Sequence, residues 1–155
     1  MQKILFVCLG NICRSPVAEG IMLHLMKEGK LHKEWQVDSA GTAGYHIGET
    51  PDHRTIKNAK KNGVDLSKLR ARKFSVTDFD TFDKIYVMDE SNFQNVLSLT
   101  KDASHHRKID YLLNVTHPAK NLPVPDPYYG NETHFEEVFQ LVYNACKKLI
   151  EVPIK

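Results

Sequence analysis

The sequence has few cysteines, little net charge and no long apolar run. Its 155 residues include three cysteines, and this small, odd number does not describe a disulfide framework. A formal net charge of +2 is too small to indicate binding to nucleic acid or to a membrane surface. No apolar segment is long enough for membrane insertion, and the first residues lack the pattern of a secretory signal. We therefore expect a cytoplasmic protein, with signal-less secretion left open.

The bulk composition is that of an ordinary globular chain. Hydrophobic residues make up 41% and charged residues 26% of the sequence, close to the averages for folded domains. A chain of 155 residues can bury a sufficient core without metals or disulfides. The length therefore predicts a single domain over residues 1–155.

Apolar runs and helical repeats alternate along the chain. Strands are predicted at 3–7, 35–37, 82–88 and 108–112, and helices at 15–29, at 50–60, from about 89 or 91, and at 133–151. Residues 120–131, rich in proline, asparagine and glycine, are predicted to form a loop. This alternation predicts an α/β fold of three layers, a central four-stranded parallel sheet with helices on both faces. In such folds ligands bind beyond the carboxyl ends of the strands.

The most informative segment follows the first strand and reads Cys8-Leu9-Gly10-Asn11-Ile12-Cys13-Arg14-Ser15. Pro16 suits the first turn of a helix, so a tight loop leads to a helix N-terminus, where free backbone N–H groups bind anions. Arg14 adds a planar donor that matches phosphate oxygens. The same positive field favours the thiolate of Cys8, which makes it a nucleophile. The segment therefore predicts a phosphate-binding loop in which Cys8 accepts a phosphoryl group.

A plainer interpretation makes Cys8 a core residue at a strand end and Arg14 a solvent-facing helix residue. By chance, a cysteine six positions before an Arg-Ser pair is expected in about one chain in a hundred. The position of the motif between a buried strand and a helix makes chance a much poorer explanation. The catalytic interpretation is favoured.

Four segments together resemble the low-molecular-weight protein tyrosine phosphatases. They begin at Val7 (VCLGNICRSP), Asp38 (DSAGT), Met88 (MDESN) and Asp126 (DPYYG), in the family's order and across nearly the whole chain. The resemblance implies a protein-tyrosine-phosphatase that hydrolyses phosphotyrosine through a cysteinyl-phosphate. The catalytic residues that it implies are Cys8, Arg14 and Asp126. The phosphate-binding residues that it implies are Leu9, Gly10, Asn11, Ile12, Cys13, Arg14 and Ser15.

Expulsion of a phenolate from phosphorus needs a nearby acid, and Asp126 is the best candidate. It stands between Pro125 and Pro127, which stiffen its loop. Loop position alone leaves an ordinary Asp-Pro turn about equally acceptable. The resemblance implies that Asp126 protonates the departing phenol and then activates the water that hydrolyses the phosphocysteine.

The resemblance also implies three supporting residues. Ser15 is expected to donate a hydrogen bond to the Cys8 thiolate, and it is suited to cap the helix as well. Asn11 and Ser39 are expected to brace the loop through hydrogen bonds. Asparagine also tolerates the left-handed backbone that a loop curled around an anion requires. From the sequence alone, Asn11 and Ser39 are plain turn residues.

The predicted substrate cleft is lined by Ile12, Tyr45, Tyr128 and Tyr129. Tyr128 and Tyr129 follow the acid directly and can stack against an aromatic leaving group. Tyr45 lies where the family commonly supplies another aromatic wall; exposed tyrosines without such a role are the alternative. At the position of Ile12 the related phosphoarginine phosphatases usually carry threonine. Phosphotyrosine is therefore favoured over phosphoarginine.

The remaining cysteines receive different roles. For Cys13 the resemblance implies a reversible disulfide with Cys8 that shields the nucleophile from irreversible oxidation. Cys146 falls on the apolar face of the last helix and is expected to be a core thiol. No second Cys or His pair has the spacing of a zinc site, and the predicted chemistry needs no metal and no cofactor.

Other polar clusters are interpreted as structural. His105 and His106 are expected in a solvated loop, and Asp89 and Glu90 at a helix cap. A solvated basic edge is expected from Lys57, Lys60, Lys61, Arg70, Arg72 and Lys73.

Three rival functions are weighed against a tyrosine phosphatase. An arsenate reductase of similar fold needs two further cysteines, and residues 82–98 contain none. A phosphoarginine phosphatase is disfavoured by Ile12. A non-catalytic phosphotyrosine-binding module would be expected to have lost Cys8, Arg14 or Asp126, and all three are present. The expected partner is a tyrosine-phosphorylated protein or peptide, bound by a monomer with weak self-association at most.

Overall fold

Four parallel strands form the central sheet, in the order β2-β1-β3-β4. The computed structural model describes residues 1–151. The strands are β1 (Gln2–Cys8), β2 (Trp35–Gly41), β3 (Lys84–Val87) and β4 (Ile109–Tyr111). This arrangement confirms the predicted four-stranded parallel sheet and places β1 in its interior.

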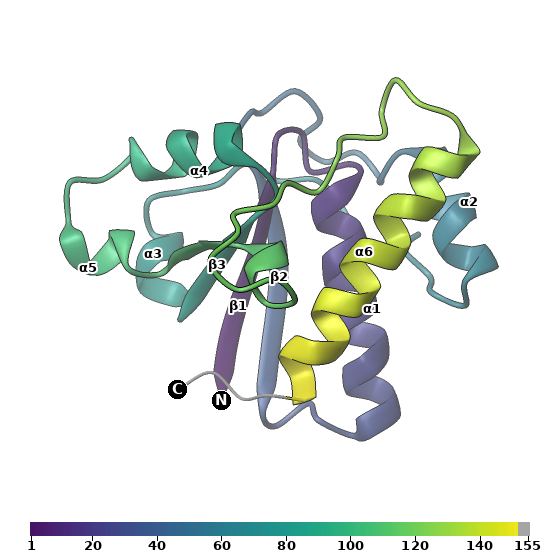
Figure 1. Cartoon of the computed structure of the whole chain (residues 1–155), viewed down its shortest axis with the longest axis horizontal. Helices are drawn as coiled ribbons and strands as arrows, with labels where there is room; N and C mark the ends of the chain where they lie inside the picture. The colour runs from purple at the N-terminus through teal and green to yellow at the C-terminus, as the bar shows by residue number, and fades with distance from the viewer. Residues whose placement is uncertain (152–155) are drawn as a thin grey trace.

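Helices cover both faces of the sheet (Figure 1). One side carries α1 (Arg14–Gly29), α2 (His53–Lys61) and α6 (Glu132–Glu151). The other side carries α3 (Asp78–Thr81), α4 (Glu90–Leu97) and α5 (Ala103–His106). A 3-10 helix, η1 (Leu112–Asn114), follows β4. The predicted three-layer fold is therefore confirmed. Across residues 1–151, every helix is too short or too polar to cross a membrane.

The continuous apolar run of β1 reflects burial on both faces. Successive side chains of a strand point to opposite faces, and Ile4 and Phe6 pack in the cluster beneath α1 and α6, whereas Leu5 and Val7 pack in the cluster beneath α3 and α4. All four side chains are fully buried. The last residue of the strand, Cys8, belongs to the α1 and α6 side.

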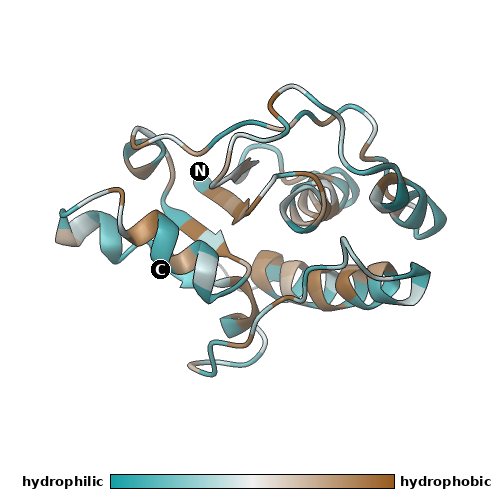
Figure 2. Cartoon of the chain, turned by 90° about the horizontal axis from the view of Figure 1, so that it is seen from above, coloured by the Kyte–Doolittle hydropathy of each residue, from teal (hydrophilic) through white to brown (hydrophobic). Residues whose placement is uncertain are grey.

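The long helix α6 shows the expected amphipathic pattern. Its buried residues are Phe135, Val138, Phe139, Val142, Ala145, Cys146 and Leu149. Their spacing puts them on one face, and brown and teal bands alternate along the helices in Figure 2. Cys146 is a buried core thiol, as predicted.

Several predicted boundaries differ from the structure. β2 extends to Gly41 rather than ending at residue 37, because its polar residues pair along β1. α2 begins at His53, since the side chain of Asp52 caps it by accepting from the N–H of Arg54. α1 begins at Arg14 and has Cys13 at its cap position without a side-chain bond, so the expectation that Ser15 caps the helix was wrong.

The short helices α3 and α5 were not predicted. α5 includes His105, whose ring stacks on Phe79 with centroids 4.7 Å apart and contacts Thr100 Oγ1 at 2.9 Å. Its side chain is 16% exposed, so it is a packed residue rather than part of a solvated loop. A four-residue helix carries too short a repeat to stand out in a sequence.

Parallel pairing brings three strand ends to one edge of the sheet. Cys8 is paired with Gly41, and Val7 with Val87. The segment after β2 then runs beside the loop after β1, where Thr42 N–H donates to Cys8 O and Ala43 N–H to Leu9 O, both at 2.9 Å. The loop that carries the motif therefore rests on the backbone that follows β2.

Gly41→Ala should destabilise the fold by about 1–3 kcal/mol, the usual cost of overpacking. A Cβ at Gly41 would lie 2.7 Å from Leu9 O and 3.1 Å from Asn11 N, and backbone atoms cannot move aside as a side chain can. Urea-induced unfolding measures the effect. Gly44→Ala is the matched control, because its Cβ would first meet Cδ1 of the exposed Ile47, at 3.1 Å. Equal stabilities of the two variants would contradict the prediction.

Candidate active site

A pocket of about 230 Å³ opens at the carboxyl end of β1. The loop after β1, the segment after β2 and the loop before α6 meet there, at the upper end of the sheet in Figure 1. The pocket is lined by Cys8, Leu9, Gly10, Ile12, Cys13, Arg14, Tyr45, His46, Asp126, Tyr128 and Tyr129. The structure therefore brings together the three predicted catalytic residues and the four predicted cleft residues.

Asn11 lies behind the pocket and shapes its loop. Its φ of 58° is in the left-handed region, as the turn expectation required. Its side chain is buried, donating through Nδ2 to Ser15 Oγ at 2.8 Å and to Ser39 Oγ at 2.9 Å. Its Oδ1 accepts from the N–H of Arg72 at 3.0 Å. Every polar group of this amide is therefore engaged.

This network fixes where the hydroxyl proton of Ser15 points. Ser15 Oγ accepts from Asn11, so its single proton is free to donate to Cys8 Sγ, which lies 2.9 Å away. A hydrogen bond donated to sulfur favours the thiolate over the thiol. The arrangement places the expected Ser15–Cys8 contact at the base of the pocket.

At its other end the network reaches Glu19, a residue that the sequence analysis did not single out. Ser39 Oγ donates to Glu19 Oε1 at 2.6 Å, leaving its lone pairs for Asn11. Burial raises the pKa of Glu19 to about 7, although the bond from Ser39 opposes this shift. The chain of contacts from Glu19 to Cys8 is thus continuous. The only sequence signal for this role of Glu19 was a polar residue on the buried face of the predicted helix.

Arg14 is buried beneath the pocket and held by three neighbours. Its Nη1 donates to Asp89 Oδ2 at 2.7 Å and to Val124 O at 3.0 Å, and its Nη2 lies 3.7 Å from Asp126 Oδ2. Burial alone would lower the pKa of Arg14, but the negative charges of Cys8, Asp89 and Asp126 raise it overall. The guanidinium therefore stays charged and can hold a phosphate oxygen.

Asp89 does more than cap a helix, which was its predicted role. Its Oδ1 accepts from the N–H of Asn92 and caps α4, while its Oδ2 accepts from Arg14. The ion pair joins Arg14 and Asp89, which are 75 positions apart, and no local sequence pattern predicts such a contact.

Arg72 likewise departs from the expected solvated edge. Its Nε donates to Asp38 Oδ2 at 2.9 Å, and its two Nη atoms donate to the buried Asp78 at 3.0 and 3.1 Å. The backbone of Arg72 is also held in place, because the N–H of Gly41 donates a hydrogen bond to Arg72 O at 2.8 Å. These bonds hold the Arg72 segment where its N–H meets Asn11.

The two cysteines of the loop are both buried but have different neighbours. Cys8 Sγ lies 2.9 Å from Ser15 Oγ, and Cys13 occupies the cap position of α1, where burial raises the pKa of its thiol to about 12. Both are free thiols in the structure. Burial thus disfavours the thiolate of Cys13, whereas Cys8 lies in the pocket with the hydroxyl of Ser15 beside its sulfur.

Comparison with known proteins agrees with this geometry. The family model described as low molecular weight phosphotyrosine protein phosphatase matches residues 3–153. The chain is 40% identical over 153 residues to the chicken (Gallus gallus) protein of that name, covering 99% of this chain and 96% of the relative. The chain belongs to the low molecular weight phosphotyrosine protein phosphatase family. The resemblance inferred from four short segments is thereby confirmed.

Solved structures of family members superpose closely on the fold. A crystal structure of protein tyrosine phosphatase from Entamoeba histolytica, with Hepes in its active site, matches with a TM-score of 0.90 and 38% identity, covering 97% of this chain and 96% of that one. A Drosophila arginine phosphatase matches with a TM-score of 0.87 and 30% identity, covering 97% and 96%. Since both kinds of enzyme share the fold, the fold alone does not choose the phosphorylated residue.

Glu19→Gln should change how stability depends on pH. Between the ordinary pKa of 4.5 and the raised value of about 7, the folded chain keeps a proton that the unfolded chain has lost. Stability therefore falls as pH rises through this window, and glutamine removes that fall. The unfolding free energy of the variant minus that of the parent should increase by up to about 3 kcal/mol between about pH 5 and about pH 8.

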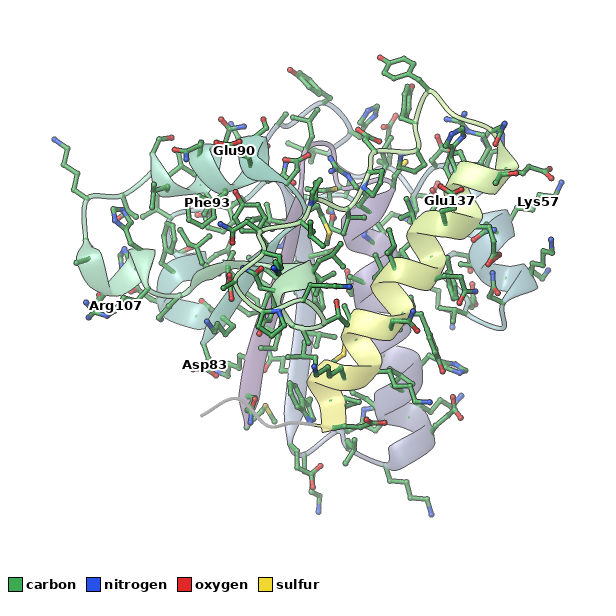
Figure 3. All side chains as sticks on the ribbon, in the orientation of Figure 1. Lys57, Asp83, Glu90, Phe93, Arg107 and Glu137 are labelled. Carbon is green, nitrogen blue, oxygen red and sulfur yellow. The ribbon has the colours of Figure 1, made fainter. Side chains whose placement is uncertain are left out.

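Urea-induced unfolding of the parent and the variant at both pH values measures this difference. Glu137→Gln, on the exposed face of α6 (Figure 3), is the control and should change the difference much less. A difference that is the same at both pH values for Glu19→Gln would contradict a raised pKa for Glu19.

Proposed function

We propose that this protein is a protein tyrosine phosphatase that hydrolyses phosphotyrosine monoesters through a cysteinyl-phosphate. One observation carries the proposal: Cys8, bonded to Ser15, shares the pocket with Arg14 and with the carboxyl group of Asp126. A nucleophile, a phosphate ligand and an acid are the groups that phosphoryl transfer through cysteine requires. Membership of the phosphatase family supports the same activity.

In the first step of the proposed reaction, the Cys8 thiolate attacks phosphorus in line with the tyrosine oxygen. The S–P bond forms as the P–O bond breaks, and Asp126 gives its proton to the departing phenolate. Arg14 and the amide groups of the loop stabilise the three equatorial oxygens. Asp126 is 44% exposed, so the leaving group and later a water molecule can reach it.

In the second step, Asp126 acts as the base. Its carboxylate takes a proton from a water molecule as the water oxygen attacks phosphorus and the P–S bond breaks. The Cys8 thiolate leaves, stabilised by the hydroxyl proton of Ser15 at 2.9 Å. Phosphate is released, and Asp126 is again protonated for the next cycle.

Phosphotyrosine fits the walls of the pocket better than a smaller phosphorylated side chain. The rings of Tyr45, Tyr128 and Tyr129 surround an opening whose base is the phosphate loop. Tyr128 and Tyr129 contact each other edge to face, with centroids 4.9 Å apart, and present aromatic surface to a phenol. Ile12 adds an apolar wall. Phosphoarginine is the alternative substrate, because an arginine phosphatase has a similar fold.

We also propose a cytoplasmic setting for the enzyme. Cys8, Cys13 and Cys146 are buried free thiols, which supports a reducing compartment. We also propose that Cys13 protects Cys8 by forming a reversible disulfide with it during oxidation. The enzyme then acts as a monomeric, single-domain protein on tyrosine-phosphorylated proteins or peptides.

Cys8→Ser should abolish phosphate release from a phosphotyrosine peptide and leave the fold intact. Serine lacks a nucleophile ionised at neutral pH, so the covalent step has no attacking group. Release is measured in reductant and EDTA, with the thermal unfolding of both proteins recorded as a control for folding. Turnover that survives in Cys8→Ser would overturn the cysteinyl-phosphate mechanism, and a parent active only on phosphoarginine would select the alternative substrate.

Asp126→Ala should slow the reaction according to the leaving group. Loss of the acid costs most when the departing phenol is strongly basic, by about 10²–10⁴-fold in kcat/KM, and least when the phenol is acidic. The measurement compares kcat/KM over a series of aryl phosphates. Equal losses across the series would exclude Asp126 as the acid.

A further inference from the structure

Arg54, which does not line the pocket, has its guanidinium fixed by Asp52. Asp52 Oδ1 accepts from Arg54 Nε at 3.0 Å and Oδ2 accepts from Nη2 at 2.8 Å. This two-point pairing sets the plane of the group. The ion pair lowers the pKa of Asp52, so the carboxylate stays charged at neutral pH. Arg54 is therefore held in one orientation at the start of α2.

The fixed guanidinium lies between two aromatic rings. Its Cζ atom is 5.3 Å from the ring centroid of Tyr128 and 4.8 Å from that of Phe135. Both distances are within the range of cation–π attraction. Phe135 is buried in the first turns of α6, whereas Tyr128 belongs to the loop before that helix. Arg54 thus attaches a loop residue to the packed body of the protein.

Asp52 and Tyr128 extend this link to the catalytic loops. The N–H of Asp52 donates to Ile12 O, in the phosphate-binding loop, at 2.8 Å. The N–H of Tyr128 donates to Asp126 Oδ1 at 3.1 Å. Asp52 and Arg54 therefore join the loop that binds phosphate to the loop that carries the acid.

The loop that carries Asp126 needs such an attachment to keep its position. Tyr129 is 95% exposed and the side chain of Asp126 is 44% exposed, and within 125–129 Pro127 is the only buried residue, so most of this stretch has little packing of its own. Arg14 reaches this stretch at Asp126 and Arg54 reaches it at Tyr128. Arg14 is also needed by the phosphate, which would compete for its donors once the substrate is bound. Arg54 has no such competing duty.

We propose that Arg54 is a positioning residue for the reaction, which places Asp126 at the leaving-group oxygen by holding Tyr128 against the phosphate loop. The inference rests on the proposed function and adds a residue to it. A displaced acid affects proton donation, whereas phosphate binding in the loop is retained. The dependence of rate on the leaving group is therefore the property that Arg54 controls.

The test measures kcat/KM of Arg54→Met for aryl phosphates with phenols of increasing basicity. Methionine keeps much of the length and packing of arginine but forms neither the ion pair nor the cation–π contact. We expect a loss of roughly tenfold or more with the most basic phenol, and less than about threefold with the most acidic one. Competitive inhibition by inorganic phosphate should stay within about twofold of the parent.

Arg107→Met is the matched control, since Arg107 lies beside α5 on the other side of the sheet from α2 (Figure 3). It should leave the whole series unchanged. Thermal unfolding is recorded for every variant, and if Arg54→Met does not fold, Arg54→Gln serves in its place, because a neutral amide forms neither the ion pair nor the cation–π contact.

Four results would overturn the inference. An unchanged series for the Arg54 variant would show that Asp126 is placed without it. An equal loss for every phenol, or weaker inhibition by phosphate, would show that Arg54 acts on the phosphate loop instead. A parent that is inactive on every aryl phosphate would overturn the proposed function first and this inference with it. The parent activity thus separates the two failures.

Discussion

The site depends on the buried amide of Asn11, held in a left-handed backbone conformation. With φ at 58°, the chain turns back so that the loop closes between β1 and α1. The amide then bonds Ser15, Ser39 and the backbone of Arg72, which belong to three separate segments. A side chain without both donor and acceptor groups could not make these contacts at once. The hydrogen bond from Ser15 to Cys8 exists because this amide has a single workable orientation.

Arg14 ties the chemistry to the fold in a different way. One nitrogen bonds both Asp89, the cap of α4, and the carbonyl of Val124, ahead of the acid loop. Arg14 also lines the pocket, where its Nη2 lies 3.7 Å from Asp126 Oδ2, and the guanidinium can hold a phosphate oxygen there. A buried cation without partners would be costly, so Asp89 is needed for Arg14 to be charged at this depth. The phosphate ligand and the packing of α4 are therefore set by one ion pair.

Structure that depends on neighbouring residues could be predicted from the sequence, whereas contacts between distant segments could not. The strand, loop and helix around Cys8 follow from an apolar run, turn residues and Pro16, which act within a few positions of one another. The contacts of Arg14 with Asp89, of Ser39 with Glu19 and of Arg54 with Tyr128 join segments that only the folded chain brings together. For Ser15 a local prediction failed, because despite its good capping propensity this residue lies inside α1, where its hydroxyl meets Cys8. Family resemblance supplied Ser39 and decided in favour of Asp126, for which loop position alone left an ordinary turn about equally acceptable.

The alternation of side chains along β1 explains why Cys8, the proposed nucleophile, is the last residue of its strand. Ile4, Phe6 and Cys8 point to the side of α1, and Leu5 and Val7 point away from it. Ser15, in the first turn of α1, can meet the sulfur only on that side. A cysteine one position earlier would face α3 and α4, away from Ser15 and the N-terminus of α1. Because β1 is buried on both faces, its register cannot slip to repair such a change. The position of Cys8 is therefore fixed jointly by the core packing of the strand and by the electrostatics of the helix that follows it.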